Sequence, residues 1–197
     1  MSDDFTSNDP RPALTRRMLL GLAVSLGVAA LRPRGLRAGP AAEPASGGTV
    51  TIEEFDVHGR TTGRKTLARV AKTDTEWRQQ LPLLAYAVTR HEGTEPAFSG
   101  MYDKNHADGL YSCICCATVL FDSRTKFDSG TGWPSFWQPI SRLNVVERND
   151  NSLGMQRTAV SCTRCDAHLG HVFDDGPRPT GLRYCMNSVA LNFTARA

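Results

Sequence analysis

The sequence predicts a mainly β fold, with two antiparallel β-sheets and a small helical hairpin at their N-terminal side. Short runs of β-branched, aromatic and apolar residues, separated by turn residues, recur from residue 109 onward. Helix-capping signals precede them, between residues 73 and 93. At 197 residues the chain is long enough for one domain with a sizeable core and additional segments.

The first 38 residues have the pattern of a signal peptide. A polar start ends in Thr15-Arg16-Arg17, and Met18–Leu31 is an uncharged, mostly apolar run of 14 residues. That run is short for a membrane span of ~20 residues and suits a signal-peptide core. A twin arginine before it resembles a twin-arginine (Tat) signal. We therefore expect export by the Tat machinery, to the periplasm. The alternative is a leader that stays uncleaved and anchors the chain in a membrane.

The basic excess belongs to this leader. The net charge is +3, but residues 1–38 carry six Arg and three Asp. The remaining 17 Lys and Arg balance 17 Asp and Glu. This balance predicts that nucleic acid is not a partner.

Residues 39–72 read as an extension before the main domain, which we place at 73–197. Gly, Pro, Ala and Ser dominate 39–48 and predict a linker. Thr49–Val70 alternates weakly around a polar stretch and predicts a β-hairpin. Thr73 and Glu76 form a capping box for a first helix. Pro82 suits the first turn of a second helix, and Gly93 can end it.

Two C-x-x-C pairs predict a structural zinc site. Two intervening residues let both sulfurs of a pair face one metal ion, so two pairs supply a complete tetrahedral set. The expected ligands of one zinc ion per chain are Cys113, Cys116, Cys162 and Cys165. Two disulfides or free thiols are the alternative. A site using the second pair with His168 and His171 would compete, but it would leave the first pair without a role.

Cys185 lies outside both pairs, in the strand-like segment 181–193. Alternation along a strand places Arg183, Cys185 and Asn187 on one face. A guanidinium there would favour the thiolate, the nucleophilic form. The spacing of His168 and His171 would place both on one face of a helical turn. A cysteine with separate histidines is a candidate nucleophile with candidate acids; the alternative is a buried structural cysteine.

Three stretches together resemble the methionine-R-sulfoxide reductases of the MsrB type. They cover roughly residues 74–193 and read E-W-R-Q-Q-L…Y-A-V-T-R-H-E-G-T-E-P-A-F-S-G, K-F-D-S-G-T-G-W-P-S-F and H-L-G-H-V-F-D-D-G-P…G-L-R-Y-C-M-N-S. The resemblance implies reduction of peptide-bound methionine R-sulfoxide, hence repair of oxidised proteins, with a thioredoxin-like reductant. Cys185 would attack the sulfoxide sulfur and become a sulfenic acid.

The resemblance also implies roles for further residues. His168 and His171 would act as general acids, and Arg183 would hold the thiolate. Asn187 and Asp175 would orient the histidines and bound water. Trp133 and Phe173 would bind substrate; an indole face is a suitable apolar wall for the sulfoxide methyl group.

This chain departs from many relatives at Thr131, where they carry a cysteine that resolves the oxidised nucleophile. Cys115, inside C-I-C-C, is a possible resolving thiol. Because a thiol beside the zinc site should be too constrained to reach Cys185, we favour direct reduction by an external thiol.

Two other classes remain open from the sequence. A non-catalytic zinc-ribbon-like binding module would explain both C-x-x-C pairs, but it predicts no low-pKa thiol. A disulfide-exchange protein would use one C-x-x-C as its redox pair and would contain no zinc.

Overall fold

The computed structural model describes residues 47–154 and 156–196. The predicted leader and most of the predicted linker lie outside the described residues. Within the described part, no helix is long and apolar enough to cross a membrane.

Two short helices form the predicted hairpin. Helix α1 spans Asp74–Gln80, and its capping box between Thr73 and Glu76 is confirmed. Helix α2 spans Leu83–His91, and the left-handed residue that ends it is Glu92 instead of Gly93. Together the helices bury Trp77, Leu81, Ala85, Tyr86 and Val88 in the main core. Helix α2 lies against strand β9, which carries both predicted histidines.

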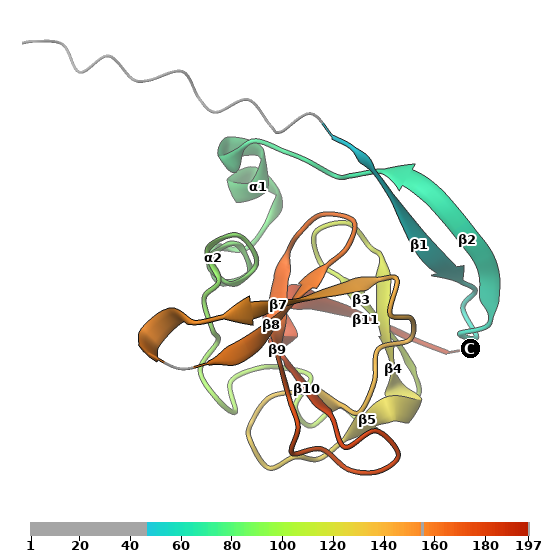
Figure 1. Ribbon diagram of the computed structural model, residues 1–197, viewed down its shortest axis with the longest axis vertical. Helices are drawn as coiled ribbons and strands as arrows, with labels where there is room; N and C mark the ends of the chain where they lie inside the picture. Colours follow the sequence, from blue (N-terminus) through green and yellow to red (C-terminus); the bar gives the residue numbers. More distant parts are fainter. Residues whose placement is uncertain (1–46, 155, 197) are drawn as a thin grey trace, which may run out of the picture. The chain divides into compact units, whose positions relative to one another are not determined.

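Two antiparallel sheets make up the body, as predicted (Figure 1). The six-stranded sheet consists, in spatial order, of β5 (Lys126–Phe127), β6 (Ser135–Phe136), β10 (Arg183–Met186), β9 (His168–Phe173), β8 (Arg157–Cys162) and β7 (Val145–Asp150). The three-stranded sheet consists of β11 (Leu191–Ala195), β3 (Gly109–Cys113) and β4 (Val119–Asp122).

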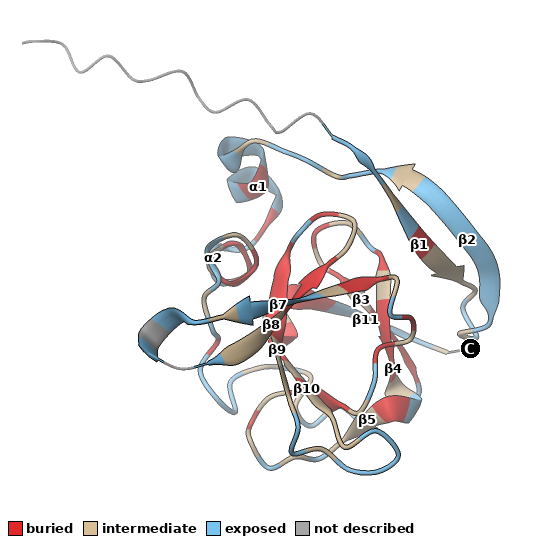
Figure 2. Cartoon of the chain, viewed as in Figure 1, coloured by how far each residue is buried: buried red, intermediate tan, exposed pale blue. Residues whose placement is uncertain are grey.

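Buried residues lie along strands of both sheets (Figure 2), and many of the side chains in this core are aromatic. Phe121 and Phe136 stack with ring centroids 4.5 Å apart, and Tyr111 meets Phe136 edge-on. These residues and Tyr184 are fully buried. Each such ring removes a large apolar area from water, so this cluster supplies much of the driving force for folding.

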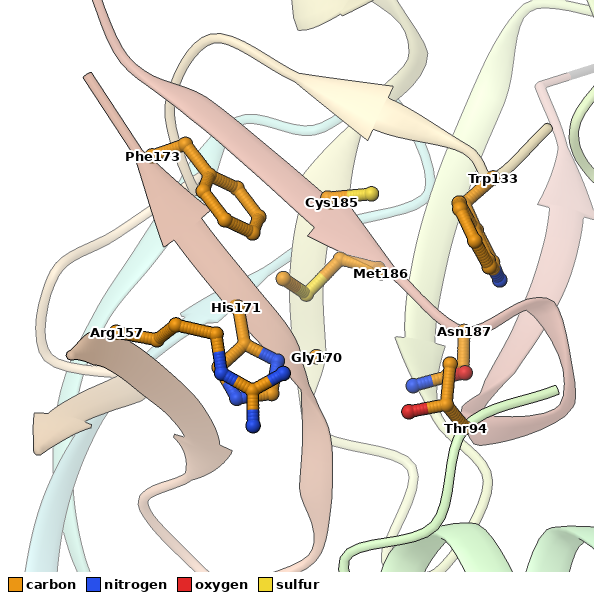
Figure 3. A pocket seen from close by; sticks show the side chains of 9 residues that line it. All are labelled: Thr94, Trp133, Arg157, Gly170, His171, Phe173, Cys185, Met186 and Asn187. Carbon is orange, nitrogen blue, oxygen red and sulfur yellow. The ribbon is translucent and has the colours of Figure 1, made fainter. Parts of the chain in front are cut away.

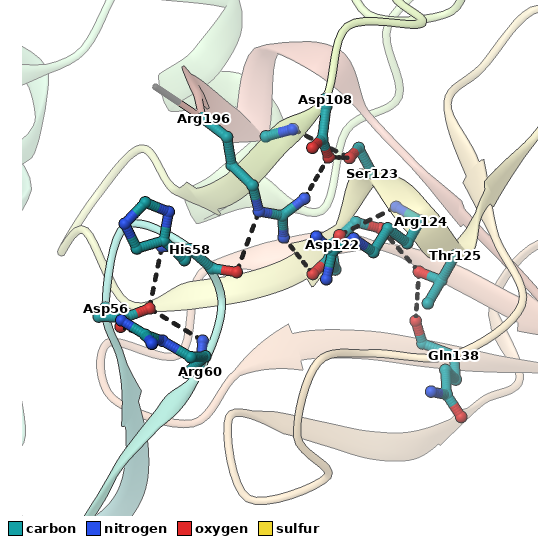
Figure 4. A network of polar contacts seen from close by, with 11 residues as sticks. Asp56, His58, Arg60, Asp108, Asp122, Ser123, Arg124, Thr125, Gln138 and Arg196 are labelled. Carbon is teal, nitrogen blue, oxygen red and sulfur yellow. Dashed lines mark hydrogen bonds and ion pairs between the residues drawn. The ribbon is translucent and has the colours of Figure 1, made fainter.

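A separate hairpin precedes the helices, at the place where the sequence predicts one. Strand β1 (Thr49–Phe55) pairs antiparallel with β2 (Thr61–Ala68). The Asn144 side chain accepts from the Glu53 N–H and donates to its carbonyl. At the hairpin turn, Arg196 donates to the His58 carbonyl and pairs with two carboxylates of the body, Asp108 and Asp122 (Figure 4).

Strand β9 contains a β-bulge that sets the direction of its histidines. Val160 of β8 pairs with Gly170 but the next residue, Ser161, pairs with His168. One residue of β9 is therefore inserted, so side chains three positions apart fall on the same face. The prediction of a helical turn for His168 and His171 is wrong. The bulge achieves the same outcome, with ring centroids 5.2 Å apart.

Gly170 is required at this bulge. Its φ of 156° is unfavourable for other residues, and a Cβ would lie 2.1 Å from the Cys185 carbonyl oxygen. We predict that Gly170→Ala lowers the free energy of unfolding by roughly 3 kcal/mol in denaturant titration. Gly48→Ala is the control, because nothing lies within 4 Å of its Cβ position. Equal stability of the two variants would contradict this account of the bulge.

Candidate active site

The two C-x-x-C turns converge on one point. The Sγ atoms of Cys113, Cys116, Cys162 and Cys165 all lie within 4.8 Å of one another. Cys113 Sγ is 3.6 Å from Cys165 Sγ, and Cys116 Sγ is 3.5 Å from Cys162 Sγ. None of the four forms a disulfide. Four thiol sulfurs at such separations fit tetrahedral coordination of one metal ion. The predicted four-cysteine cluster is confirmed as a potential metal site.

Both turns have the same backbone design. The residue after the second cysteine, Ala117 or Asp166, is left-handed. Its N–H donates to the carbonyl of the first cysteine. The N–H of the first cysteine donates to the carbonyl of the fifth residue after it: Cys113 to Thr118, and Cys162 to Ala167. The equivalent turns hold each sulfur pair toward the other. All four ligand positions come from protein thiols, so this site leaves no place for substrate.

Cys185 lies in the other candidate site, on the opposite side of β10 from the core. Register pairs it with His171 of β9 on one side and Ser135 of β6 on the other. It lines a cavity of about 140 Å³, shown in Figure 3. The other lining residues are Thr94, Trp133, Arg157, Gly170, His171, Phe173, Met186 and Asn187. The cavity therefore combines a thiol, apolar walls and a few polar groups, as small-molecule sites do.

The environment of Cys185 differs from the one predicted. Burial raises the pKa of its thiol. Thr131, Arg183 and Ser135 oppose this effect but do not reverse it. Arg183 does lie close enough to act on the sulfur, as alternation along the strand predicts. Its guanidinium favours the thiolate, as expected, but desolvation has the larger effect on the pKa of Cys185.

Asp150 is the carboxylate that holds His171. Its Oδ2 is 2.8 Å from His171 Nε2 and 2.7 Å from Arg157 Nη2. Hydrogen bonds from Ser152 and from His171 hold the pKa of Asp150 well below its usual range, so it is ionised at neutral pH. It must accept from His171, which places a proton on Nε2.

Asp175 does not contact the histidines. Its carboxylate makes a two-pronged contact with Arg183, at 2.9 and 2.7 Å, and the hydrogen bonds lower the pKa of Asp175. The same guanidinium lies 4.4 Å from the centre of the Phe173 ring. The predicted orienting role of Asp175 toward the histidines is therefore wrong; it fixes Arg183 beside Cys185.

His168 is buried behind the cavity. Its side chain is not among those that line the cavity, and neither ring nitrogen has a hydrogen-bond partner among residues 47–154 and 156–196. Burial first, and then the neighbouring His171, lower the pKa of His168 to about 4. The ring is neutral at physiological pH, so it can offer one N–H but no imidazolium proton.

Glu95 organises the far wall of the cavity. This buried carboxylate accepts from the main-chain N–H groups of Ser188 and Val189. Its own N–H donates to Asn187 Oδ1, and its carbonyl accepts from Trp133 Nε1 at 3.1 Å. Asn187 also donates to the Leu169 carbonyl, beside the bulge. Asn187 thus orients the backbone next to the histidines and makes no hydrogen bond to either ring.

Thr131 occupies the position expected to distinguish this chain from many relatives. Its Oγ1 is 3.8 Å from Cys185 Sγ, so a hydroxyl stands where a thiol could have reached the nucleophile. Cys115 is buried in the core cluster beside the four-cysteine site, and its carbonyl accepts from Gln80. It is not among the residues that line the cavity.

Two important residues were not recognised from the sequence. Asp150 belongs to none of the sequence motifs, and Glu95 lies in the first of the three family-like stretches without a predicted role of its own. The only sequence signal for either was its acidic type. His171 lies 21 residues from Asp150, and Asn187, Ser188 and Val189 lie 92 to 94 residues from Glu95.

Comparison with known proteins gives a consistent result. The SelR domain matches residues 81–195. A "Peptide methionine sulfoxide reductase MsrB" from Pseudomonas syringae pv. syringae is 58% identical over 129 residues, covering 66% of this chain and 98% of that protein. Proteins of the same name from Thioalkalivibrio sulfidiphilus and Herminiimonas arsenicoxydans are 61% and 57% identical over 125 and 127 residues. These cover 62% and 64% of this chain, and 90% and 93% of the respective proteins.

The fold and the cysteine-bearing cavity are those of a SelR-domain protein. The chain belongs to the MsrB family of peptide methionine sulfoxide reductases.

The environment of Cys185 predicts slow alkylation at neutral pH. Because burial raises its pKa, its reaction with iodoacetamide should reach half-maximal rate at a higher pH than an ordinary cysteine, whose pKa is about 8.5. Arg183→Gln should move that midpoint higher still. Mass-spectrometric counting of the alkylated Cys185 peptide measures both. A midpoint below pH 8 in the unmodified protein would contradict the dominance of desolvation.

The buried His168 predicts a specific pH dependence of stability. The pKa of His168 is about 4 in the folded protein and 6.5 when exposed. Between these two values, His168 binds a proton in the unfolded chain but not in the folded chain. Folding should lose about 3 kcal/mol from this group as pH falls from 6.5 to 4. Urea unfolding of wild type and His168→Phe isolates the effect, because Phe cannot titrate. Parallel pH curves for the two proteins would refute it.

Proposed function

We propose that this protein reduces peptide-bound methionine R-sulfoxide to methionine, with Cys185 as the nucleophile. The observation that carries the proposal is the placement of this thiol between Trp133 and His171 in a small cavity of a MsrB-family fold. The Trp133 ring provides an apolar surface for the sulfoxide methyl group, and the Phe173 ring provides a second one. The R epimer is assigned by family resemblance, since the S epimer belongs to a different enzyme.

In the first step the Cys185 sulfur bonds to the sulfoxide sulfur and takes over its oxygen. One thiol and one sulfoxide give one sulfenic acid and one thioether, so the thiol proton ends on the transferred oxygen. Cys185 is oxidised by two electrons and the substrate is reduced by two. A thiol with a raised pKa keeps its proton until substrate is bound. Little thiolate is then present in the free protein to react with other oxidants.

The histidines have different roles in this mechanism. His171 lines the cavity and Asp150 holds its ring through Nε2, so we assign His171 as the general acid for the sulfoxide oxygen. His168 is neutral and contributes at most a hydrogen bond, because its N–H and lone pair have no partner in the protein. The positioning residues are Asp150, Glu95 and Asn187. Arg183 stabilises negative charge that develops on the Cys185 sulfur during the reaction.

Regeneration is assigned to an external thiol of the thioredoxin class. An incoming thiol condenses with the sulfenic acid, releasing water and forming a mixed disulfide, and a second thiol of the same partner then releases Cys185. Thr131 next to Cys185 and the burial of Cys115 support this route over an internal disulfide.

We assign zinc to the four-cysteine cluster as a structural ion. Four converging thiols at C-x-x-C spacing suit Zn²⁺, which would supply folding energy and no chemistry at Cys185.

We also propose export through the Tat machinery, and so repair of oxidised proteins outside the cytoplasm. The twin arginine before Met18–Leu31 supports this location. Tat transport moves folded proteins, which would allow the cysteine cluster to bind its metal before it meets an oxidising compartment.

Cys185→Ser tests the function directly. We expect loss of methionine formation from a dabsyl-type methionine R-sulfoxide, by at least about 10³-fold, because a hydroxyl cannot replace the sulfur nucleophile. Metal content by elemental analysis should remain at one ion per chain, since Cys185 is not a ligand.

Cys115→Ser is the matched control. It also removes one thiol, but it should retain turnover with an external dithiol. Equal activity of Cys185→Ser and wild type would remove Cys185 from the mechanism, and loss of activity in Cys115→Ser with metal retained would make Cys115 a participant.

A further inference from the structure

A second cavity lies between the N-terminal hairpin and the second C-x-x-C turn. Its volume is about 430 Å³. The hairpin contributes its two ends, Gly47–Gly48 and Arg69–Val70, and the Val70 N–H donates to the Arg164 carbonyl. The other lining residues are Ala71, Lys72, Trp77, Arg90, Arg164, Cys165 and Asp166. The cavity is separate from the one that contains Cys185, with which it shares no residue.

The lining is strongly basic. Arg69, Lys72, Arg90 and Arg164 are present, and none of them makes an ion pair within the described residues. Asp166 is the one carboxylate of the lining, and Arg148 neutralises it at 2.7 Å. Four cations that make no ion pair among the described residues therefore gather here, although the chain from residue 39 onward has as many acidic as basic residues; of the four, Lys72 also donates to Gln80 and helps to lower the pKa of Glu76.

Two of these cations are held in place on an aromatic surface. Lys72 Nζ and the Arg90 guanidinium lie 5.2 and 4.9 Å from the centre of the buried Trp77 ring. Arg90 also donates to the Cys165 carbonyl. The Arg164 Nε is buried and has no hydrogen-bond partner. A buried, unpartnered guanidinium nitrogen has a free-energy cost unless a ligand accepts from it.

The hairpin that completes this cavity is additional to the family domain. Strands β1 and β2 precede residue 81, where the SelR match begins. Relatives matched over 125 to 130 residues are covered at 90 to 100% of their length, so they are much shorter than this chain. The basic cavity is therefore a feature that the reductase chemistry at Cys185 does not require.

We propose that this cavity binds a phosphate-type oxyanion that forms part of a larger molecule. Guanidinium groups bind phosphate oxygens through paired hydrogen bonds, and Arg69, Arg90 and Arg164 all line the cavity. The volume exceeds what a single phosphate group needs. The anion can come from a soluble phosphate compound or from the headgroup of an anionic lipid.

Compensation of the thiolate cluster is the competing explanation for these cations. Four thiolates around Zn²⁺ carry a net charge of −2, and Arg90 and Arg164 lie near Cys165. Arg69 and Lys72 come from the hairpin end and the following connection. If they too compensated the cluster, removing them would change metal retention, and no anion would bind.

The test uses the full chain with its metal and the double variant Arg69→Gln/Lys72→Gln. The experiment has two arms. In the pyrophosphate arm, inorganic pyrophosphate is titrated into the protein and binding is measured by calorimetry. In the vesicle arm, binding is measured by co-sedimentation of the protein with phosphatidylglycerol vesicles. We expect binding in at least one arm, weakened at least about tenfold in the double variant. Arg64→Gln/Lys104→Gln is the matched control, because it removes the same charges from exposed positions outside the cavity. Reductase activity and metal content should be unchanged in both variants.

Binding in the pyrophosphate arm identifies a soluble phosphate compound, and binding in the vesicle arm alone identifies a lipid headgroup. Absence of binding in both arms would overturn the proposal. Equal weakening by the control variant would also overturn it, because it would show general attraction to surface charge. Loss of metal from the double variant without anion binding by the wild type would favour the compensation explanation.

Discussion

The rest of the structure depends on the convergence of four cysteine sulfurs at one point. Cys113 and Cys116 follow from strand β3 of the three-stranded sheet, and Cys162 and Cys165 join β8 to β9 of the six-stranded sheet. A metal held there would link both sheets and close a long loop between the pairs, which would limit the freedom of the unfolded chain. Strand β9, with both histidines, begins three residues after the last of these cysteines.

That anchor sets the starting position of the strand on which the active site is built. The bulge in β9 turns His168 and His171 to one face, and Gly170 lets β9 approach the Cys185 carbonyl closely. Asp150 then holds His171 from β7, while Glu95 holds Trp133 and the segment after Cys185. Scaffold and site are therefore connected through one set of hydrogen bonds.

The sequence predicted what depends on short spacings. The capping box at Thr73 and the two C-x-x-C pairs are local patterns with fixed geometry, and the structure confirms both. The predicted helical turn at His168 failed because a bulge gives the same three-residue periodicity. The sequence predicts that Asp175 orients the histidines, whereas Asp150 contacts His171 and Asp175 pairs with Arg183; only the three-dimensional fold decides which carboxylate meets which partner. The raised pKa of Cys185 reflects three-dimensional burial, which the neighbouring Arg183 in the sequence does not reveal.

The central claim is that Cys185 acts alone within the chain and is restored by an external thiol. Single-turnover stoichiometry tests it most directly: the reduced, metal-loaded protein, freed of reductant, is mixed with excess peptide methionine R-sulfoxide. Methionine formed and thiols lost are then counted per chain. The account predicts one methionine and the loss of one thiol, Cys185. One methionine with two thiols lost would reveal an internal disulfide, and no methionine at all would contradict the reductase assignment.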